Sequence, residues 1–199
     1  MKKKFKYGIG ICLLFIFIVL YSFIDKKYPI YNQDIPAEEY VLCAMLEENT
    51  SISQTFHAEG ESMKAVSLKC AVSGVEEKGE LRYIVYDDNG RDVRKGVIPI
   101  AKLKSEKYND FEFDTIENCQ GREFTFEVCG KDIEECNVSF YKTIDKMDET
   151  LLRRDQEIEE GTLVLKSVTY TFDWETLIVV SCFTVYIIIF IRMLYKFFR

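Results

Sequence analysis

The chain has 199 residues, a formal net charge of −7 and a single histidine. Residues 26–173 carry 19 Lys and Arg against 31 Asp and Glu, which gives this segment a net charge of −12. Because binding to phosphates needs Lys and Arg, so acidic a segment argues against a partner that is nucleic acid or anionic lipid. The length suits one domain with additional segments.

An apolar run over residues 8–24 follows a basic tail, residues 1–7. The run is long enough to cross a bilayer core of about 30 Å as a helix. Four lysines precede it and two follow it, so the positive-inside rule places the N-terminus in the cytoplasm. A cleaved signal peptide is the alternative, but Tyr21-Ser22-Phe23-Ile24 offers a poor cleavage site. We therefore expect an uncleaved transmembrane helix.

The next segments lead from the membrane into a β-rich region. Residues 25–37 are expected to form an extended stalk, because Pro29 and Pro36 disfavour helix. Residues 38–48 are compatible with helix or strand, with a preference for strand. From residue 51 onward apolar and polar side chains alternate, which is typical of strands with one face in a core. The predicted core includes Val66, Leu68, Tyr83, Val85, Phe111, Phe113, Phe124, Phe126 and Phe140.

Turn-forming residues separate these strands. Asp87-Asp88-Asn89-Gly90 predicts a hairpin, since Asn-Gly favours tight turns, and its oxygen spacing does not match a calcium loop of the EF-hand type. Residues 118–121 and 130–135 are also interpreted as turns. Residues 145–160 lack alternation and predict a long surface loop, with a short helix at 149–155 as an option. A last strand over residues 163–172 leads into a second apolar run.

The second apolar run, residues 175–194, predicts another transmembrane helix. Acidic residues precede it and basic residues follow it, so the tail at residues 195–199 is expected in the cytoplasm. The two runs agree on the orientation. We therefore predict an all-β protein, an antiparallel β-sandwich over residues 38–173 outside the plasma membrane, flanked by two transmembrane helices.

Four short motifs lie between Ser53 and Tyr141. They are Gln54-Thr55-Phe56, then Leu81 to Asp87 followed by Gly90, then Tyr108 with Phe111-Glu112-Phe113, and Gly121 followed by Phe124-Thr125-Phe126. This pattern resembles the membrane-anchored extracellular jelly-roll domains, similar to carbohydrate-binding domains, of bacterial surface-polysaccharide membrane proteins. The resemblance implies a jelly-roll fold, a bacterial source and a carbohydrate-related setting. It transfers no catalytic residue.

Catalytic and metal-binding motifs do not stand out. His57 lies beside a core strand, and no nucleophile motif, Walker loop or zinc-ligand spacing occurs, so we predict no catalytic site, no cofactor and no metal. The predicted outer domain has an odd number of cysteines. Pairing strand 124–128 with strand 138–140 sets Cys129 and Cys136 on opposite faces, which predicts no disulfide between them.

Two functions follow from these observations. The first is a non-catalytic module that binds glycan or another cell-envelope polymer, with Arg82, Tyr86 and Tyr141 as outward-facing contacts. The alternative interpretation of these three residues is an ordinary sheet surface. The second function is a structural accessory subunit of a membrane complex for polysaccharide synthesis or export, although small residues at the spacing of tight helix pairs are lacking.

Overall fold

The computed structural model describes residues 2–43, 45–74, 79–133, 136–155 and 157–198. It has two compact units, which are treated separately below. Lys26–Thr169 form a β-rich unit, and Met1–Asp25 with Tyr170–Arg199 form a helical unit.

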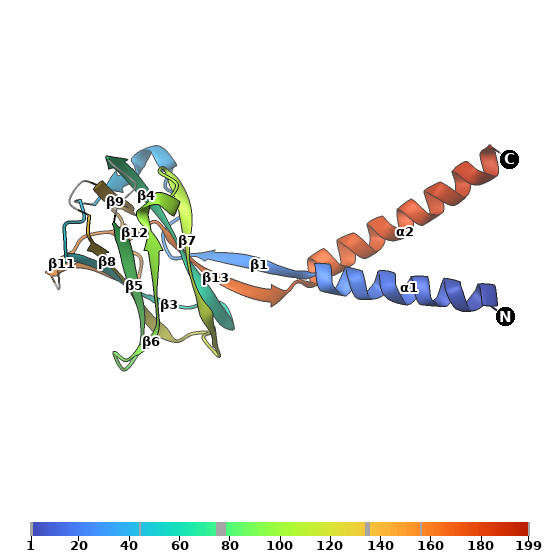
Figure 1. Cartoon of the computed structure of the whole chain (residues 1–199), viewed down its shortest axis with the longest axis horizontal. Coiled ribbons are helices and arrows are strands. Elements are labelled where there is room, and N and C mark those ends of the chain that lie inside the picture. The colour runs from blue at the N-terminus through green and yellow to red at the C-terminus, as the bar shows by residue number, and fades with distance from the viewer. Residues whose placement is uncertain (1, 44, 75–78, 134–135, 156, 199) are drawn as a thin grey trace. The chain divides into compact units, whose positions relative to one another are not determined.

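One sheet contains six antiparallel strands among the described residues, in the order β11-β10-β3-β8-β5-β6 (Figure 1). The predicted hairpin joins β5 to β6, where the Gly90 N–H donates to the Asp87 carbonyl at 2.9 Å. Gly90 has a φ of +71°, which glycine adopts without strain. The strands are β3 (Ser51–His57), β5 (Glu80–Asp87), β6 (Asp92–Pro99), β8 (Glu123–Lys131), β10 (Leu151–Arg154) and β11 (Glu157–Glu159).

The described part of the second sheet has seven strands, in the order β1-β13-β4-β9-β12, with β7 on β4 and β2 on β9. Its centre is β4, whose 13 residues allow it to pair with β7 as well as with β13 and β9. The strands are β1 (Phe23–Pro29), β2 (Val41–Leu42), β4 (Ser62–Gly74), β7 (Lys107–Glu117), β9 (Cys136–Thr143), β12 (Thr162–Leu163) and β13 (Leu165–Phe172). Two short 3-10 helices, η1 (Ala37–Glu39) and η2 (Ile100–Lys102), lie between strands.

The core contains the aromatic side chains that the alternation predicted. Tyr83, Phe111 and Phe126 form a cluster with ring centroids 5.3–6.1 Å apart. Eight of the nine predicted core residues are buried, and Phe113 is partly buried against the same core. Both sheets contribute to this one cluster, so the predicted antiparallel, two-sheet fold is confirmed.

The expected stalk and the ambiguous segment after it are partly strands. β1 begins at Phe23, two residues before the expected stalk, and ends at Pro29 within it; it pairs with β13 of the second sheet. Tyr31, also in the expected stalk, is buried. Residues 38–48 contain the end of η1 and the two-residue strand β2, so neither a full helix nor a full strand forms. Pro36 precedes η1, and its fixed φ suits that first turn.

The loop and helix expected over residues 145–160 are wrong in part. This segment contains β10 and β11, which pair with each other, and β10 also pairs with β3. Leu152 is buried there and anchors the strand. Strands of four and three residues are too short for the alternation of side chains to stand out in a sequence.

The expected hairpin between strand 124–128 and strand 138–140 is wrong. β8 pairs with β3 and β5, whereas β9 pairs with β4 in the other sheet. The alternation of apolar and polar side chains identifies which residues face the core. It does not show whether two such strands lie in the same sheet or in opposite sheets, because both kinds of strand point their apolar side chains into the core. The register argument for Cys129 and Cys136 therefore fails, and the Cys136 side chain lies outside the described residues, so the absence of that disulfide stays a prediction.

The helical unit contains α1 (Lys2–Tyr21) and α2 (Trp174–Phe197). In the part of the chain that the structure describes, α2 is long and apolar enough to cross a membrane, and the apolar stretch Cys12–Tyr21 is shorter. Asp173 caps α2, because its Oδ2 accepts a hydrogen bond from the Thr176 N–H at 2.9 Å. The predicted start of the second helix is therefore correct to within one residue.

Candidate functional site

The outer face of the six-stranded sheet carries rows of polar side chains. Residues directly opposite each other in an antiparallel pair point to the same side of the sheet. One row across β10, β3, β8 and β5 is Leu151, Thr55, Thr125 and Tyr86. The next row contains Arg153, Ser53 and Glu127. The Thr55 and Thr125 hydroxyls are 2.9 Å apart, which fixes the middle of the first row.

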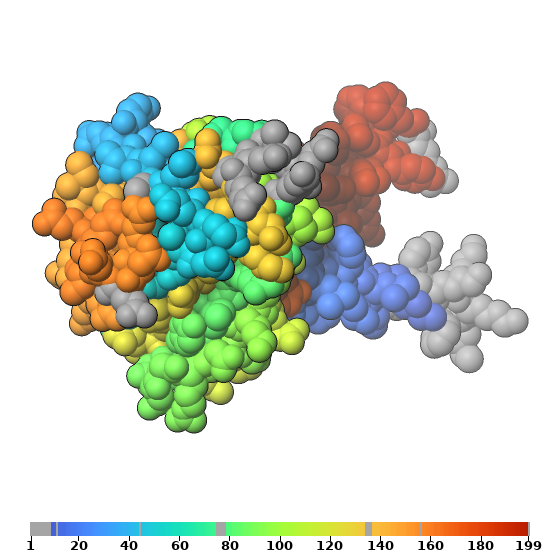
Figure 2. Space-filling view, turned by 60° about the vertical axis from the view of Figure 1, so that its left-hand side comes forward, coloured from blue at the N-terminus to red at the C-terminus, as the bar shows by residue number. Residues whose placement is uncertain are grey.

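A hollow of about 700 Å³ lies over these rows. Its volume falls within the range of small-molecule sites, roughly 300–1,000 Å³. The hairpin residues Asp87 and Asp88 and the segment 146–150 contribute to its lining, together with the hydroxyls of the rows. Figure 2 shows the chain near residues 150–160 (orange) and the β5–β6 hairpin (green) on the same face of the β-rich unit. The hollow is therefore built by strands that are distant in sequence.

The lining of the hollow is acidic. Its described residues include two cationic side chains, Lys146 and Arg153, against the five carboxylates of Asp87, Asp88, Glu123, Glu127 and Glu149. The formal charge of the lining is therefore −3. An anionic ligand would be repelled, whereas neutral hydroxyl groups or cations would find acceptors.

Tyr86 and Asp87 have well-defined hydrogen-bonding roles in this hollow. Burial, together with the Glu127 carboxylate that its hydroxyl faces, raises the pKa of Tyr86, so the hydroxyl stays protonated. The backbone N–H groups of Arg91 and Asn89 donate to Asp87 Oδ1 at 2.9 and 3.0 Å and lower the pKa of that carboxyl. Asp87 therefore holds the hairpin at the edge of the hollow, and Tyr86 offers a ring within it.

His57 lies at the end of β3 on the same face. Its Nδ1 is 3.6 Å from Glu149 Oε2, and its side chain is 38% exposed. None of the hydrogen bonds among the described residues joins His57 to a hydroxyl or a thiol. His57 Nδ1 is a buried atom without a hydrogen-bond partner in the described part of the chain, and the geometry offers no activated nucleophile.

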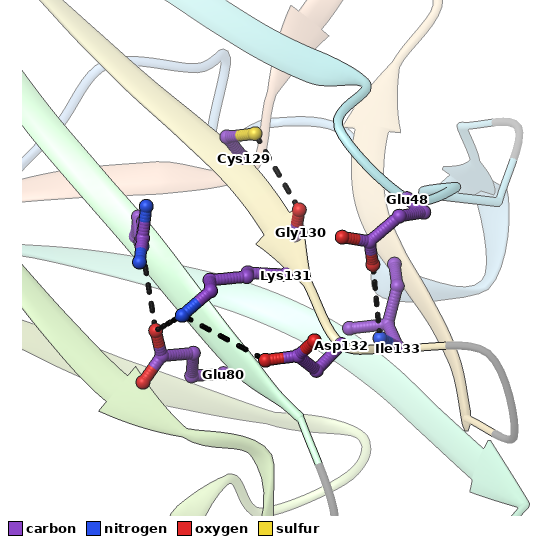
Figure 3. Close-up of polar contacts among 8 residues, drawn as sticks. Glu48, Glu80, Cys129, Gly130, Lys131, Asp132 and Ile133 are labelled. Atoms are coloured by element: carbon purple, nitrogen blue, oxygen red, sulfur yellow. Dashed lines mark hydrogen bonds and ion pairs between the residues drawn. The ribbon is translucent and has the colours of Figure 1, made fainter.

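Arg82 shares the face with Tyr86 but does not line the hollow. It lies in the row of Ser51 and Cys129, four residues from Tyr86 and so about 13 Å away along the strand. Glu80 Oε1 accepts hydrogen bonds from Arg82 Nε and Lys131 Nζ, both at 3.3 Å. Figure 3 shows Lys131 between the carboxylates of Glu80 and Asp132. Arg82 is thus part of a surface ion-pair network.

Tyr141 lies on β9 in the other sheet, and the protein itself occupies both its ring and its hydroxyl. The hydroxyl donates to a Glu106 carboxylate oxygen, which raises the pKa of Tyr141 to about 12. The Lys69 ammonium lies 4.6 Å from the centroid of the Tyr141 ring and 5.2 Å from that of Tyr40. The three predicted contact residues therefore do not form one site.

The outer face around Tyr141 is covered by the chain that follows β1. Tyr31 is only 6% exposed, and its hydroxyl lies 2.5 Å from the Tyr108 hydroxyl on β7. The Lys166 ammonium lies over the ring of Tyr108, 4.4 Å from its centroid. Internal contacts thus use the aromatic groups of this face, and the hollow on the opposite sheet is the better candidate site.

Sequence reasoning missed most of the groups in the hollow. The hydroxyls of Ser51, Ser53, Thr55 and Thr125 stand at outward positions of β3 and β8, where alternation alone could have placed them. Their convergence with Tyr86 could not be predicted, because it depends on β3, β8 and β5 being neighbours. The segment 146–150 lies in the predicted surface loop over residues 145–160, to which the sequence assigns no functional role.

The fold and the hollow define the chain as an antiparallel β-sandwich with a polar, acidic recess on one outer face. No model of a known protein family matches the chain. A comparison with curated proteins likewise finds no match.

Proposed function

We propose that this protein is a membrane-anchored, non-catalytic module whose outer domain binds a glycan or another cell-envelope polymer in the hollow. The observation that carries the proposal is the combination of the hydroxyl rows with the Tyr86 ring in one recess. Both termini lie in the cytoplasm and the β-rich unit lies outside, with α1 and α2 as two membrane spans.

The chemistry of the hollow suits a polyhydroxyl ligand. Ser and Thr hydroxyls both donate and accept hydrogen bonds, and carboxylates accept them, so the lining can satisfy sugar hydroxyls in either role. The Tyr86 ring offers an apolar surface with a polar tip, as binding surfaces often do.

The membrane anchorage is supported by the two helices. No side chain of α2 is buried among the described residues, and its exposed surface is rich in Ile, Val and Phe. Basic residues lie on the N-terminal side of the first apolar run and at the C-terminal end of the second, and acidic residues lie where α2 begins. This distribution favours two membrane spans with both chain termini in the cytoplasm. The bacterial, jelly-roll setting implied by the sequence resemblance fits this arrangement.

The test measures binding of the full chain in lipid nanodiscs to a panel of immobilised oligosaccharides. Tyr86→Ala should weaken binding by about two- to tenfold, since an aromatic contact contributes roughly 0.5–1.5 kcal/mol. Tyr141→Ala is the matched control, because it removes a ring from the other sheet and should leave affinity unchanged. If no oligosaccharide binds, or both variants weaken binding equally, the proposal fails. A co-purifying membrane complex without glycan binding would favour the accessory-subunit function instead.

A further inference from the structure

We infer that the hollow selects glycans that carry free, protonated amino groups, a ligand class that rests on the glycan-binding function proposed above. Two features lead there: an excess of carboxylates in the lining of the hollow, and hydroxyl rows between and beside two of them.

The two carboxylates nearest the hydroxyl rows belong to Glu123 and Glu127 on β8. Both point outward on either side of Thr125, so they stand about 13 Å apart along the strand. Neither belongs to an ion pair among the residues that the structure describes. The neutral Tyr86 hydroxyl faces Glu127, whose row also contains Ser53 and Arg153, and Glu123 lies opposite His57.

Two other carboxylates of the lining, those of Asp87 and Asp88, already face cationic partners. Asp87 lies 4.0 Å from Arg91, and Asp88 lies 3.8 Å from Arg122. Glu149 faces the only histidine of the chain. Lys146 and Arg153 also line the hollow and offset part of its charge, but the lining as a whole keeps a formal charge of −3. The carboxylates of Glu123 and Glu127 lie on β8, where the proposed ligand would contact the sheet.

An ammonium group on a sugar meets this charge better than a hydroxyl does. A hydrogen bond between an ammonium and a carboxylate is roughly twice as strong as one between neutral groups. Ser53, Thr55 and Thr125 lie beside the carboxylates and suit the remaining sugar hydroxyls. A basic peptide would satisfy Glu123 and Glu127 but would leave these hydroxyls without sugar partners.

The experiment compares two hexasaccharides with the same β-1,4 backbone, glucosamine hexamer and cellohexaose, on the full chain in nanodiscs at pH 6. The amino sugar should bind at least tenfold more tightly, and added salt should reduce this preference, because salt screens exposed charges. Glu123→Gln with Glu127→Gln keeps the shape of both side chains and should reduce the preference to about twofold or less. Glu112→Gln, an exposed carboxylate on β7 of the other sheet, is the control and should preserve it.

Each outcome has a defined meaning. Equal affinity for the two hexasaccharides would overturn selection by charge and would leave glycan binding intact. If neither hexasaccharide binds and the other glycans of the panel also fail to bind, the proposed function itself is refuted. Tighter binding of oligolysine than of the glucosamine hexamer, lost in the double variant, would overturn the glycan class in favour of a basic peptide.

Discussion

Phe126→Ala provides the most direct test of the core. Phe126 is 1% exposed, and its ring centroid lies 5.5 Å from Phe111 and 6.1 Å from Tyr83. Truncating a buried Phe to Ala typically costs about 3–5 kcal/mol. Because two aromatic pairs are lost as well, we expect the upper part of that range, a large share of the roughly 5–15 kcal/mol that stabilises a domain.

The assay is thermal unfolding of the full chain in detergent micelles, followed by near-ultraviolet circular dichroism of the tyrosines. At about 2–4 °C per kcal/mol, Phe126→Ala should lower Tm by about 10–15 °C. Thr125→Ala is the neighbouring control on the outer face, where it removes one hydrogen bond to Thr55 and should cost about 1 kcal/mol or less. Equal shifts in the two variants would refute the assignment of the inward and outward faces of β8.

Three further predictions concern a buried amide, an ion pair and the topology. Gln54 is fully buried and its Oε1 accepts a backbone N–H of the opposite sheet at 3.0 Å, so Gln54→Ala should cost at least about 1–3 kcal/mol of unfolding free energy in the same thermal assay. Burial opposes ionisation of Asp110, but hydrogen bonds, foremost from Lys27, outweigh it and lower the pKa. Such a carboxylate stabilises the fold above its unfolded pKa of about 3.9 and loses that contribution as pH falls through the folded value. Asp110→Asn should thus be less stable than wild type at pH 7, by under about 1 kcal/mol because the pair with Lys27 is partly exposed. In urea unfolding, the difference in unfolding free energy between the two proteins should disappear below about pH 4. On intact cells, Lys95→Cys should react with a membrane-impermeant maleimide more strongly than the unsubstituted chain does, whereas Lys3→Cys should not. The reverse pattern would contradict the proposed orientation, with the β-rich unit outside and the termini in the cytoplasm.

The alternation of side chains predicts which residues face the core, but it does not predict strand partners. Phe124 and Phe126 on β8 and Phe140 on β9 were all placed inward correctly. The pairing of β8 with β3 joins residues about 70 positions apart, as in Thr55 with Thr125. No local turn specifies so distant a contact, because it depends on how the whole sandwich closes.

The candidate site shows the same division between local and non-local information. The outward orientation of Tyr86 and Tyr141 follows from their strands and could be predicted. Tyr141 is nevertheless engaged by Lys69 and Glu106, and the segment of residues 30–40 lies against its face of the sheet. Only the three-dimensional fold distinguishes an outward residue that the chain covers from one that lines an open recess.

Cys129 and Cys136 are expected to remain unlinked for a reason that the strand order provides. Cys129 is a free thiol in the outward row of Ser51 and Arg82, whereas β9 begins at Cys136 in the other sheet, where its first residue pairs with Gly74. Sheets of a sandwich stack about 10 Å apart. A disulfide needs Cα atoms within about 7 Å and side chains that point toward each other. Forming one would require the end of β8 to rotate, which would turn outward groups of the hollow toward the core. Mass spectrometry of the alkylated, non-reduced protein should find both cysteines modified, and a peptide pair linked through them would show that β8 ends in a different orientation.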